Sequence, residues 1–341
     1  MVEKTAIIDI KNQDIGLKIL FPEADYFILE EEFDRTRINT KYNIVPIIHN
    51  KDNNIFEEIS NNKYDNLFII IPIYDALEIY DNKINSFFKK NIHNYLLEII
   101  NLINSNDFNN ISIFDNYDYD YDPNIIFDAE FIKEKRIKFF KRNYNKEKTY
   151  ISNVYPFPYI IFGHQCNIEM ITDLFYKNIS MQNKYSRIFF SGTPFIHVDN
   201  EYGIIRNRRE MIMNIQNKIN IYNPGQLPHE LFMNEMINSK YSLDLLGVGD
   251  PNIRTFEILC SGSLRIGQRT NLKWTFDDEF CEETIFDNEN DLLEKIIRLE
   301  NDPELYKKCI DKQNEIVRKY MNIDILRNYI YNHFYKYTKT I

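Results

Sequence analysis

The sequence has few of the features that place a protein outside the cell or across a membrane. Its 341 residues include four cysteines, Cys166, Cys260, Cys281 and Cys309. None of them forms a CxxC pair or a Cys/His spacing typical of a metal site. We therefore expect reduced, structural thiols and a cytoplasmic location. No run of about 18 apolar residues occurs and the N-terminus lacks an apolar h-region, so we expect neither a transmembrane segment nor a signal peptide.

Positive charge is also scarce. The chain has 41 Lys and Arg against 51 Asp and Glu, a net charge of −10. Binding of a phosphate backbone normally needs a strong basic field, so nucleic acid is not an expected partner. Local basic clusters still suffice for one small diphosphate.

The length and the order of apolar segments indicate two α/β domains. A single core rarely serves more than about 250–300 residues. Strands are predicted at residues 5–10, 25–29, 65–73 and 111–114, with a helix at 84–103. Such strand–helix–strand runs are typical of parallel βαβ units. We predict two Rossmann-like domains, an acceptor-binding domain at residues 1–180 and a nucleotide-sugar-binding domain at 181–325, and a C-terminal helix at 326–341 that packs back on the body.

The second half repeats the alternation. Strands are predicted at residues 187–191, 218–222, 241–246 and 263–266, and helices at 206–214, 228–239, 253–260, 291–300 and 303–320. A basic run at 133–148 and a Pro-punctuated apolar segment at 155–162 lie between the halves and receive no assignment.

The most informative segment follows the predicted strand at 241–246. Gly247 and Gly249 permit a close approach of the backbone to a ligand. Asn252 leads into a helix whose first turn contains Arg254, and a helix N-terminus with a guanidinium attracts phosphate. Glu257 lies on the same helix face, where it could accept hydrogen bonds from ribose hydroxyls.

These residues alone leave another interpretation open, in which Arg254 and Glu257 form a surface ion pair beside an ordinary glycine turn. The spacing fits neither a Walker A loop nor a complete G-x-G-x-x-G fingerprint.

The run SKYSLDLLGVGDPNIRTFEILCSGSLRI, residues 239–266, resembles the C-terminal donor-binding motif of GT-B glycosyltransferases. It is most similar to the exostosin-like and CgeB-like groups (glycosyl transferases group 1). The shared pattern is a Lys–aromatic strand, a glycine loop, Arg-x-x-Glu and a Gly before the next strand. Residues 284–300 and 302–308 fit the tail of the same pattern, so the resemblance covers about residues 185–325.

The resemblance implies a GT-B fold, with two Rossmann-like domains facing across a cleft. It implies transfer of a sugar from a UDP-, GDP- or dTDP-sugar to a hydroxyl of a glycan or glycoconjugate, as in glycan biosynthesis, with no metal or other cofactor. The retaining-type E-x7-E motif is absent, because Arg265 stands eight residues after Glu257. Inversion is therefore the expected outcome.

In similar enzymes a second loop faces the donor diphosphate. Here a strand ending at Gly192 leads to Arg206, Arg208 and Arg209. The alternative is a solvated basic start of a helix. The full expected donor-binding set is Gly192, Arg206, Arg209, Gly247, Gly249, Asn252, Arg254, Thr255 and Glu257.

An inverting enzyme also needs a general base. The candidates are Asp115, Asp118, Asp120 and His164, each of which could equally be an ordinary loop residue. The run DYDYD, residues 118–122, also contains the D-x-D pattern of a metal site. Other open alternatives are an epimerase or phosphotransferase acting on a sugar nucleotide and a non-catalytic sugar-nucleotide-binding protein.

Overall fold

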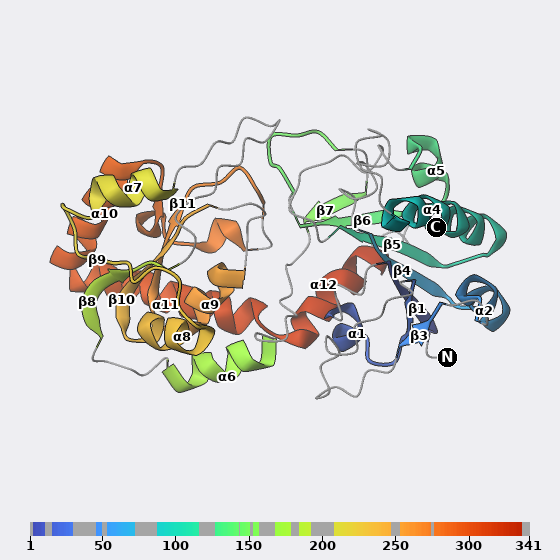
Figure 1. Cartoon of the computed structure of the whole chain (residues 1–341), viewed down its shortest axis with the longest axis horizontal. Helices are drawn as coiled ribbons and strands as arrows, with labels where there is room; N and C mark the ends of the chain where they lie inside the picture. Colours follow the sequence, from blue (N-terminus) through green and yellow to red (C-terminus); the bar gives the residue numbers. More distant parts are fainter. Residues whose placement is uncertain are drawn as a thin grey trace. The chain divides into compact units, whose positions relative to one another are not determined.

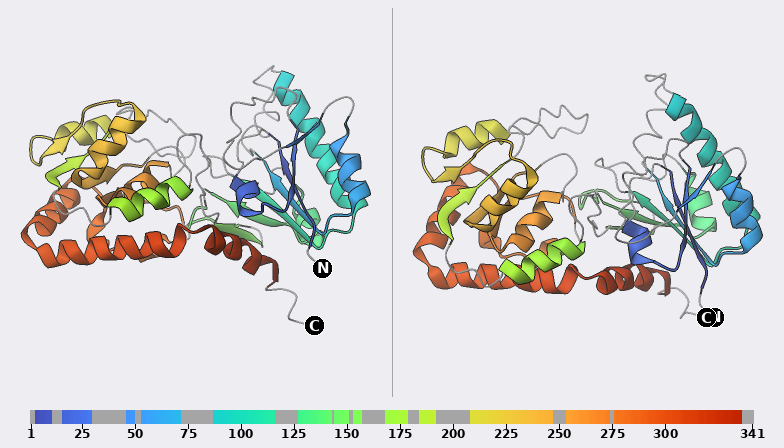
Figure 2. Two further views of the ribbon diagram at one scale, coloured as in Figure 1. Left: turned by 90° about the horizontal axis from the view of Figure 1, so that it is seen from below. Right: turned by 60° about the horizontal axis from the view of Figure 1, so that its bottom comes forward.

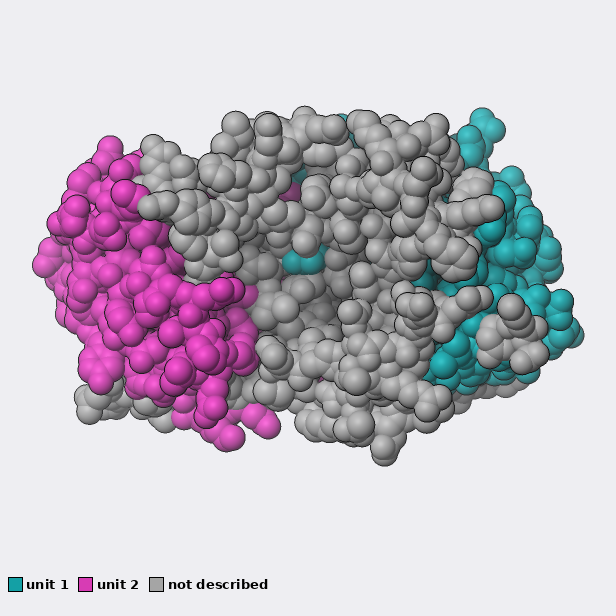
Figure 3. All heavy atoms as spheres, viewed as in Figure 1, with its two compact units in different colours: residues 1–164, 327–341 teal, residues 165–326 magenta. Residues whose placement is uncertain are grey.

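The computed structural model describes thirteen ranges of the chain: residues 3–10, 16–29, 46–49, 53–71, 87–115, 127–142, 144–150, 153–156, 168–178, 184–191, 208–246, 253–273 and 276–335. The chain forms two compact units (Figure 3). Unit 1 consists of Met1–His164 together with Arg327–Ile341, and unit 2 of Gln165–Leu326. None of the helices in the described ranges is both long and apolar enough to cross a membrane.

Unit 1 is built on a parallel sheet with the strand order β3-β2-β1-β4-β5-β6-β7 (Figure 1). Its strands are β1 (Thr5–Asp9), β2 (Asp25–Ile28), β3 (Ile47–Ile48), β4 (Asn66–Ile70), β5 (Asn110–Asp115), β6 (Lys138–Lys141) and β7 (Val154–Pro156). Its helices are α1 (Gly16–Leu20), α2 (Ile55–Asn62), α4 (Phe87–Ser105) and α5 (Ala129–Glu134). The strands and the helix predicted for this half correspond to β1, β2, β4, β5 and α4.

Helices cover both faces of this sheet, which is why its central strands β1 and β4 are buried along their whole length. One face packs against α2, α4 and α5 in a single core. The other face packs against α1 and against α12 (Ile323–Tyr335) (Figure 2). Tyr331 of α12 meets Phe21 edge-to-face, and His333 meets Phe140. Helix α12 overlaps the range 326–341 predicted as a C-terminal helix, and its residues from Arg327 onward belong to unit 1; residues 336–341 lie outside the described residues.

Unit 2 contains a second parallel sheet with the order β12-β11-β10-β8-β9. Its strands are β8 (Tyr185–Phe189), β9 (Ile221–Tyr222), β10 (Ser239–Asp244), β11 (Leu264–Gln268) and β12 (Ile285–Phe286). Its helices are α6 (Ile168–Asn178), α7 (Arg208–Ile215), α8 (His229–Ile237), α9 (Ile253–Ser261), α10 (Glu289–Asn301) and α11 (Pro303–Tyr320), and two 3₁₀ turns, η4 (Asp277–Glu279) and η5 (Glu282–Thr284), precede β12. All elements predicted for this half are present.

The two faces of this sheet are also covered. Helices α7, α10 and α11 contribute to the core on one face, and α8 and α9 pack on the other. The α/β class with two parallel sheets is therefore confirmed. The division into units differs from the predicted boundary near residue 180 by α6, which packs on α9 and lies in unit 2.

Candidate functional site

The strand order of unit 2 marks one edge of its sheet as a ligand site. The chain passes from β8 to β9 on one side and then to β10 on the other side of β8. In open α/β sheets, ligands bind outside the carboxyl ends of the strands where the order reverses in this way. Here that point lies beyond the ends of β8 and β10. The two glycine-containing segments expected to bind the donor follow these two strands in the chain.

Arg254 lies at this edge. It is the second residue of α9, and its guanidinium carbon is 5.4 Å from the ring centroid of Phe190, the residue that follows β8. Thr255, beside it, is 1% exposed. The half-buried guanidinium and the N-terminus of α9 therefore meet at the reversal point. Both carry positive charge, and both suit a phosphate.

Glu257 is buried one turn further along α9. It is 4% exposed, and its Oε1 lies 2.8 Å from Nε2 of His229, the first residue of α8. Burial raises the pKa of Glu257, while the hydrogen bond with His229 and the charges of His229 and Arg254 oppose that rise. The pair joins the first residue of α8 to the second turn of α9.

His229 is a site residue that the sequence analysis missed. Its ring also stacks on Phe232 with centroids 6.2 Å apart. The one available signal was its place at the start of the helix predicted at 228–239. Its contact with a residue 28 positions away depends on the topology, which the sequence does not display.

A third loop, between β9 and α8, is hydrogen-bonded to the same edge of the sheet. The hydroxyl of Ser191, at the end of β8, donates a hydrogen bond to the carbonyl of Gly225 at 2.6 Å. Gly225 has φ +79°, a conformation that suits glycine, and a Cβ there would meet nothing within 4 Å. Asn223 accepts a hydrogen bond from the Gly225 N–H at 3.2 Å. The loop between β9 and α8 thus leaves open space at this glycine.

A buried ion pair supports the end of β10. Arg265 Nε donates to Asp244 Oδ2 at 2.6 Å, and both side chains are 4% exposed. Gly267 makes room for it, since a Cβ there would lie 2.2 Å from the guanidinium carbon. The backbone N–H of Arg265 donates to the side chain of Gln313 at 2.8 Å. Arg265, which stands eight positions after Glu257, thus has a structural role at the end of β10.

Among the base candidates, the structure describes Asp115. It ends β5, and its Oδ2 lies 2.8 Å from Nζ of Lys141 on β6. The Asp115 and Lys141 side chains are 2% and 0% exposed. This buried pair favours a structural role for Asp115 over proton transfer to a substrate.

The remaining expected site residues lie in parts of the chain that the structure does not describe in full. Gly192, Arg206, Gly247, Gly249, Asn252, Asp118, Asp120 and His164 lie outside the described residues, and Arg209 lies in α7 without a described side chain. Across the described ranges, no group of three or more His, Cys, Asp or Glu side chains is arranged to hold a metal ion.

No family model matches the chain, and no curated protein matches it. Several solved glycosyltransferase structures are similar over nearly the whole length. One is a DNA-modifying enzyme, β-glucosyltransferase, studied with and without uridine diphosphoglucose, at a TM-score of 0.47 and 13% identity, covering 97% of this chain and 99% of that one.

Two others are synthases of phosphorylated sugars. For sucrose-phosphate synthase from Thermosynechococcus elongatus the TM-score is 0.41 at 11% identity, with 99% of this chain and 100% of that chain covered. For α,α-trehalose 6-phosphate synthase from Burkholderia multivorans the values are 0.46 and 9%, with 98% and 96% covered.

Proposed function

We propose that this chain is a GT-B-type glycosyltransferase that binds a nucleotide-sugar donor at the carboxyl edge of the unit 2 sheet. It transfers the sugar to a hydroxyl of a glycan or glycoconjugate, with inversion and without a metal ion. The observation that carries the proposal is the position of Arg254, which lies on the first turn of α9 and over Phe190 at the strand-order reversal.

The first requirement of sugar transfer is stabilisation of the departing nucleoside diphosphate. Positive groups placed where negative charge develops are the means available to a metal-free site. Arg254 offers a charged fork for two phosphate oxygens, and the first N–H groups of α9 point in the direction from which the chain enters. Gly192, Arg206, Arg209, Gly247, Gly249 and Asn252 complete the proposed diphosphate site.

The second requirement is recognition of the nucleoside. In this proposal Glu257 accepts hydrogen bonds from the ribose hydroxyls. Its Oε1 is engaged by His229, whereas Oε2 has no hydrogen-bond partner within the described part of the chain. His229 therefore fixes the carboxylate and leaves one oxygen for a ligand. The bond also opposes the rise in the pKa of Glu257 that burial causes.

The third requirement is removal of the acceptor proton. Asp120 and His164 stay the proposed bases, since the ion pair with Lys141 makes Asp115 the weaker choice. A base of either kind would act on the acceptor hydroxyl as the bond to the nucleoside diphosphate breaks.

A screen of donor hydrolysis and transfer over UDP-, GDP- and dTDP-sugars tests the proposal. We expect one donor to be hydrolysed slowly in water and faster with an oligosaccharide acceptor. Duplex DNA belongs in the acceptor panel, and the net charge of −10 predicts that it is not used. Release of an epimerised sugar, or nucleotide binding with no turnover of any donor, would replace this proposal with the alternatives of an epimerase or a non-catalytic binding protein.

A further inference from the structure

The side chain of His229 is held against Glu257 by aromatic packing. Helices α8 and α9, which carry the two residues, lie side by side on one face of the unit 2 sheet (Figure 1). The His229 ring stacks on Phe232, with ring centroids 6.2 Å apart and ring planes at 29°. Phe232 in turn packs on Phe189 of β8, with centroids 5.6 Å apart. The sheet therefore supports the imidazole in the position from which it reaches Glu257.

The hydrogen bond between these two side chains has one direction when Glu257 is ionised. An ionised carboxylate only accepts hydrogen bonds, so Nε2 of His229 donates to Oε1 across the 2.8 Å between them. Burial raises the pKa of Glu257, and this hydrogen bond and the charges of His229 and Arg254 oppose the rise. Loss of the His229 side chain would leave burial opposed by the charge of Arg254. The carboxyl would then be protonated more readily, and a neutral carboxyl is the weaker acceptor.

The second carboxylate oxygen of Glu257 is the one that a ligand can use. Glu257 is 4% exposed, and its Oε2 has no hydrogen-bond partner within the part of the chain that the structure describes. A carboxylate oxygen has about two acceptor positions. The adjacent 2′- and 3′-hydroxyls of a ribose supply two donors, whereas a 2′-deoxyribose supplies one. A deoxynucleotide would therefore leave a buried acceptor position unpaired, and a site built to bond a hydroxyl rejects an analogue that lacks it.

We propose that His229 is a positioning residue that makes the donor site select a ribonucleoside diphosphate over its 2′-deoxy counterpart. The selection depends on the proposed function, in which Glu257 faces the ribose of the donor. His229 acts through the carboxylate: it fixes which oxygen meets the ribose hydroxyls, and it favours the ionised form that accepts strongly. The donors that fit are UDP- and GDP-sugars. A dTDP-sugar is disfavoured, because its pentose lacks the 2′-hydroxyl.

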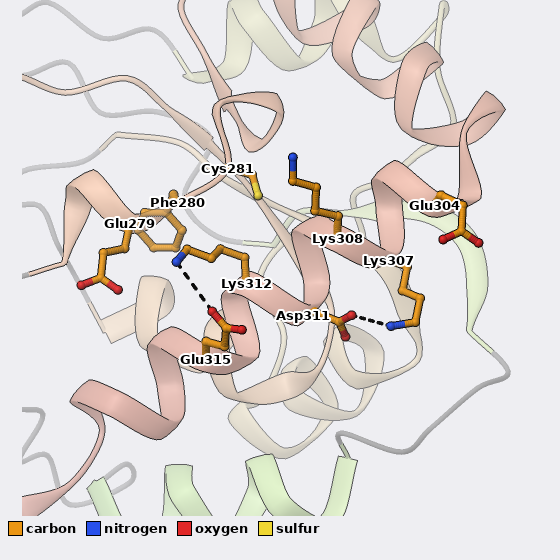
Figure 4. Close-up of a pocket in the computed structure, with 9 residues that line it drawn as sticks. All are labelled: Glu279, Phe280, Cys281, Glu304, Lys307, Lys308, Asp311, Lys312 and Glu315. Carbon is orange, nitrogen blue, oxygen red and sulfur yellow. Dashed lines mark hydrogen bonds and ion pairs between the residues drawn. The ribbon is translucent and has the colours of Figure 1, made fainter.

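A pocket beside α11 is a rival location for a nucleotide, and its charges do not suit one. It has a volume of about 470 Å³ and is lined by side chains of α11 and of residues 279–281 (Figure 4). Lys307, Lys308 and Lys312 line it together with four carboxylates, and Figure 4 shows two of these lysines paired with carboxylates. Because carboxylates outnumber lysines, a diphosphate is disfavoured there. Lys308→Ala is therefore a control that should leave nucleotide affinity unchanged.

The experiment measures binding of UDP, dUDP, GDP, dGDP and dTDP to the full chain by calorimetric titration. In the unmodified sequence, the ribonucleotide of the preferred base should bind roughly 10- to 150-fold more tightly than its 2′-deoxy form, the range for a hydrogen bond to a charged group. His229→Phe keeps a ring on Phe232 but removes the N–H donor. The ratio should then fall by roughly five- to tenfold, the difference between a charge-assisted and a neutral hydrogen bond. His229→Gln supplies an N–H donor without the ring and should keep a ratio close to that of the unmodified sequence.

A packing role for His229 predicts the reverse order, with the Phe variant closer to the unmodified sequence than the Gln variant. That order, equal binding of a ribonucleotide and its 2′-deoxy form, or tightest binding of dTDP would overturn the assignment of His229 and leave the proposed function standing. If none of the five nucleotides binds, both fail. The urea midpoint of each variant is measured first. If His229→Phe does not fold, His229→Ala takes its place, because the His229 side chain is 35% exposed and its truncation leaves little cavity.

Discussion

Replacing Arg254 with alanine tests the assignment of the donor site directly, because the structure predicts separate effects on binding and on folding. A hydrogen bond from a charged donor to phosphate contributes about 1.5–3 kcal/mol. At 1.4 kcal/mol for each factor of ten, Arg254→Ala should weaken binding of the matching nucleoside diphosphate by roughly 10- to 150-fold. Arg254→Lys keeps the charge without the planar fork and should lose less.

The same substitution should barely change stability. Loss of the contact with Phe190 costs about 0.5–1 kcal/mol. Removing a cation from the first turn of α9 stabilises the fold by about 0.3–1 kcal/mol, because the helix dipole disfavours positive charge there. The two terms nearly cancel, so the free energy of unfolding should move by less than about 1 kcal/mol.

Calorimetric titration with UDP, GDP and dTDP measures the first effect, and urea unfolding measures the second. Arg187→Ala is the matched control, because Arg187 lies on β8 but bonds Ser239 at 2.9 Å, at the start of β10 and so toward the opposite edge of the sheet. It should lower stability and leave nucleotide affinity unchanged. If Arg254→Ala binds the nucleotide as tightly as the unmodified sequence, the donor site lies elsewhere.

Three further results are expected. Because the pKa of Glu257 is raised in the folded state, its contribution to stability declines as the pH rises from about 4.3 through the folded-state pKa. Urea unfolding between pH 4 and 8 should therefore show a smaller decline in unfolding free energy for Glu257→Gln than for the unmodified sequence. Parallel curves for the two proteins would contradict this expectation. Lys141→Met leaves the Asp115 carboxylate buried without its cation and should cost roughly 3–5 kcal/mol of unfolding free energy; a loss below about 1 kcal/mol would show that the pair is not buried in solution. EDTA should leave donor turnover unchanged, whereas a loss restored by manganese would move the assignment to a D-x-D site at residues 118–120.

Much of the fold follows from local pattern. The segments at 5–10 and 65–73 are rich in apolar residues because helices cover both faces of β1 and β4, and that pattern is visible without a structure. The helix at 303–320 has the predicted bounds, and its start is marked by Asp302 at the N-cap and Pro303 in the first turn.

Strand β6 shows where local pattern fails. It lies inside the basic run 133–148, whose lysines suggest a solvated surface. Lys138 and Lys141 are instead buried, and they bond Asn110 at 3.3 Å and Asp115 at 2.8 Å on the neighbouring strand. A buried lysine needs a hydrogen-bond partner, and here Asn110 lies 28 positions from Lys138 and Asp115 lies 26 positions from Lys141. Only the pairing of β5 with β6 brings them together.

The site was predictable to a similar extent. Arg254 and Glu257 are predicted as site residues from helix periodicity and a resemblance to known motifs, both of which are local. The partner of Glu257 was not, because His229 reaches it from the next helix. The buried pair of Asp115 with Lys141 likewise changes the weight given to Asp115 as a base, and nothing near Asp115 in the chain reveals it.

The return of α12 to unit 1 has a consequence for synthesis on the ribosome. An N-terminal domain usually folds while the next is being translated. Here Tyr329 donates a hydrogen bond to the Pro156 carbonyl at 2.7 Å, and Ile330 is fully buried. Until this stretch emerges from the exit tunnel, the part of the first sheet that α12 covers stays exposed throughout translation of residues 165–326. The nascent chain therefore exposes apolar surface during that interval, and such surface is prone to aggregation.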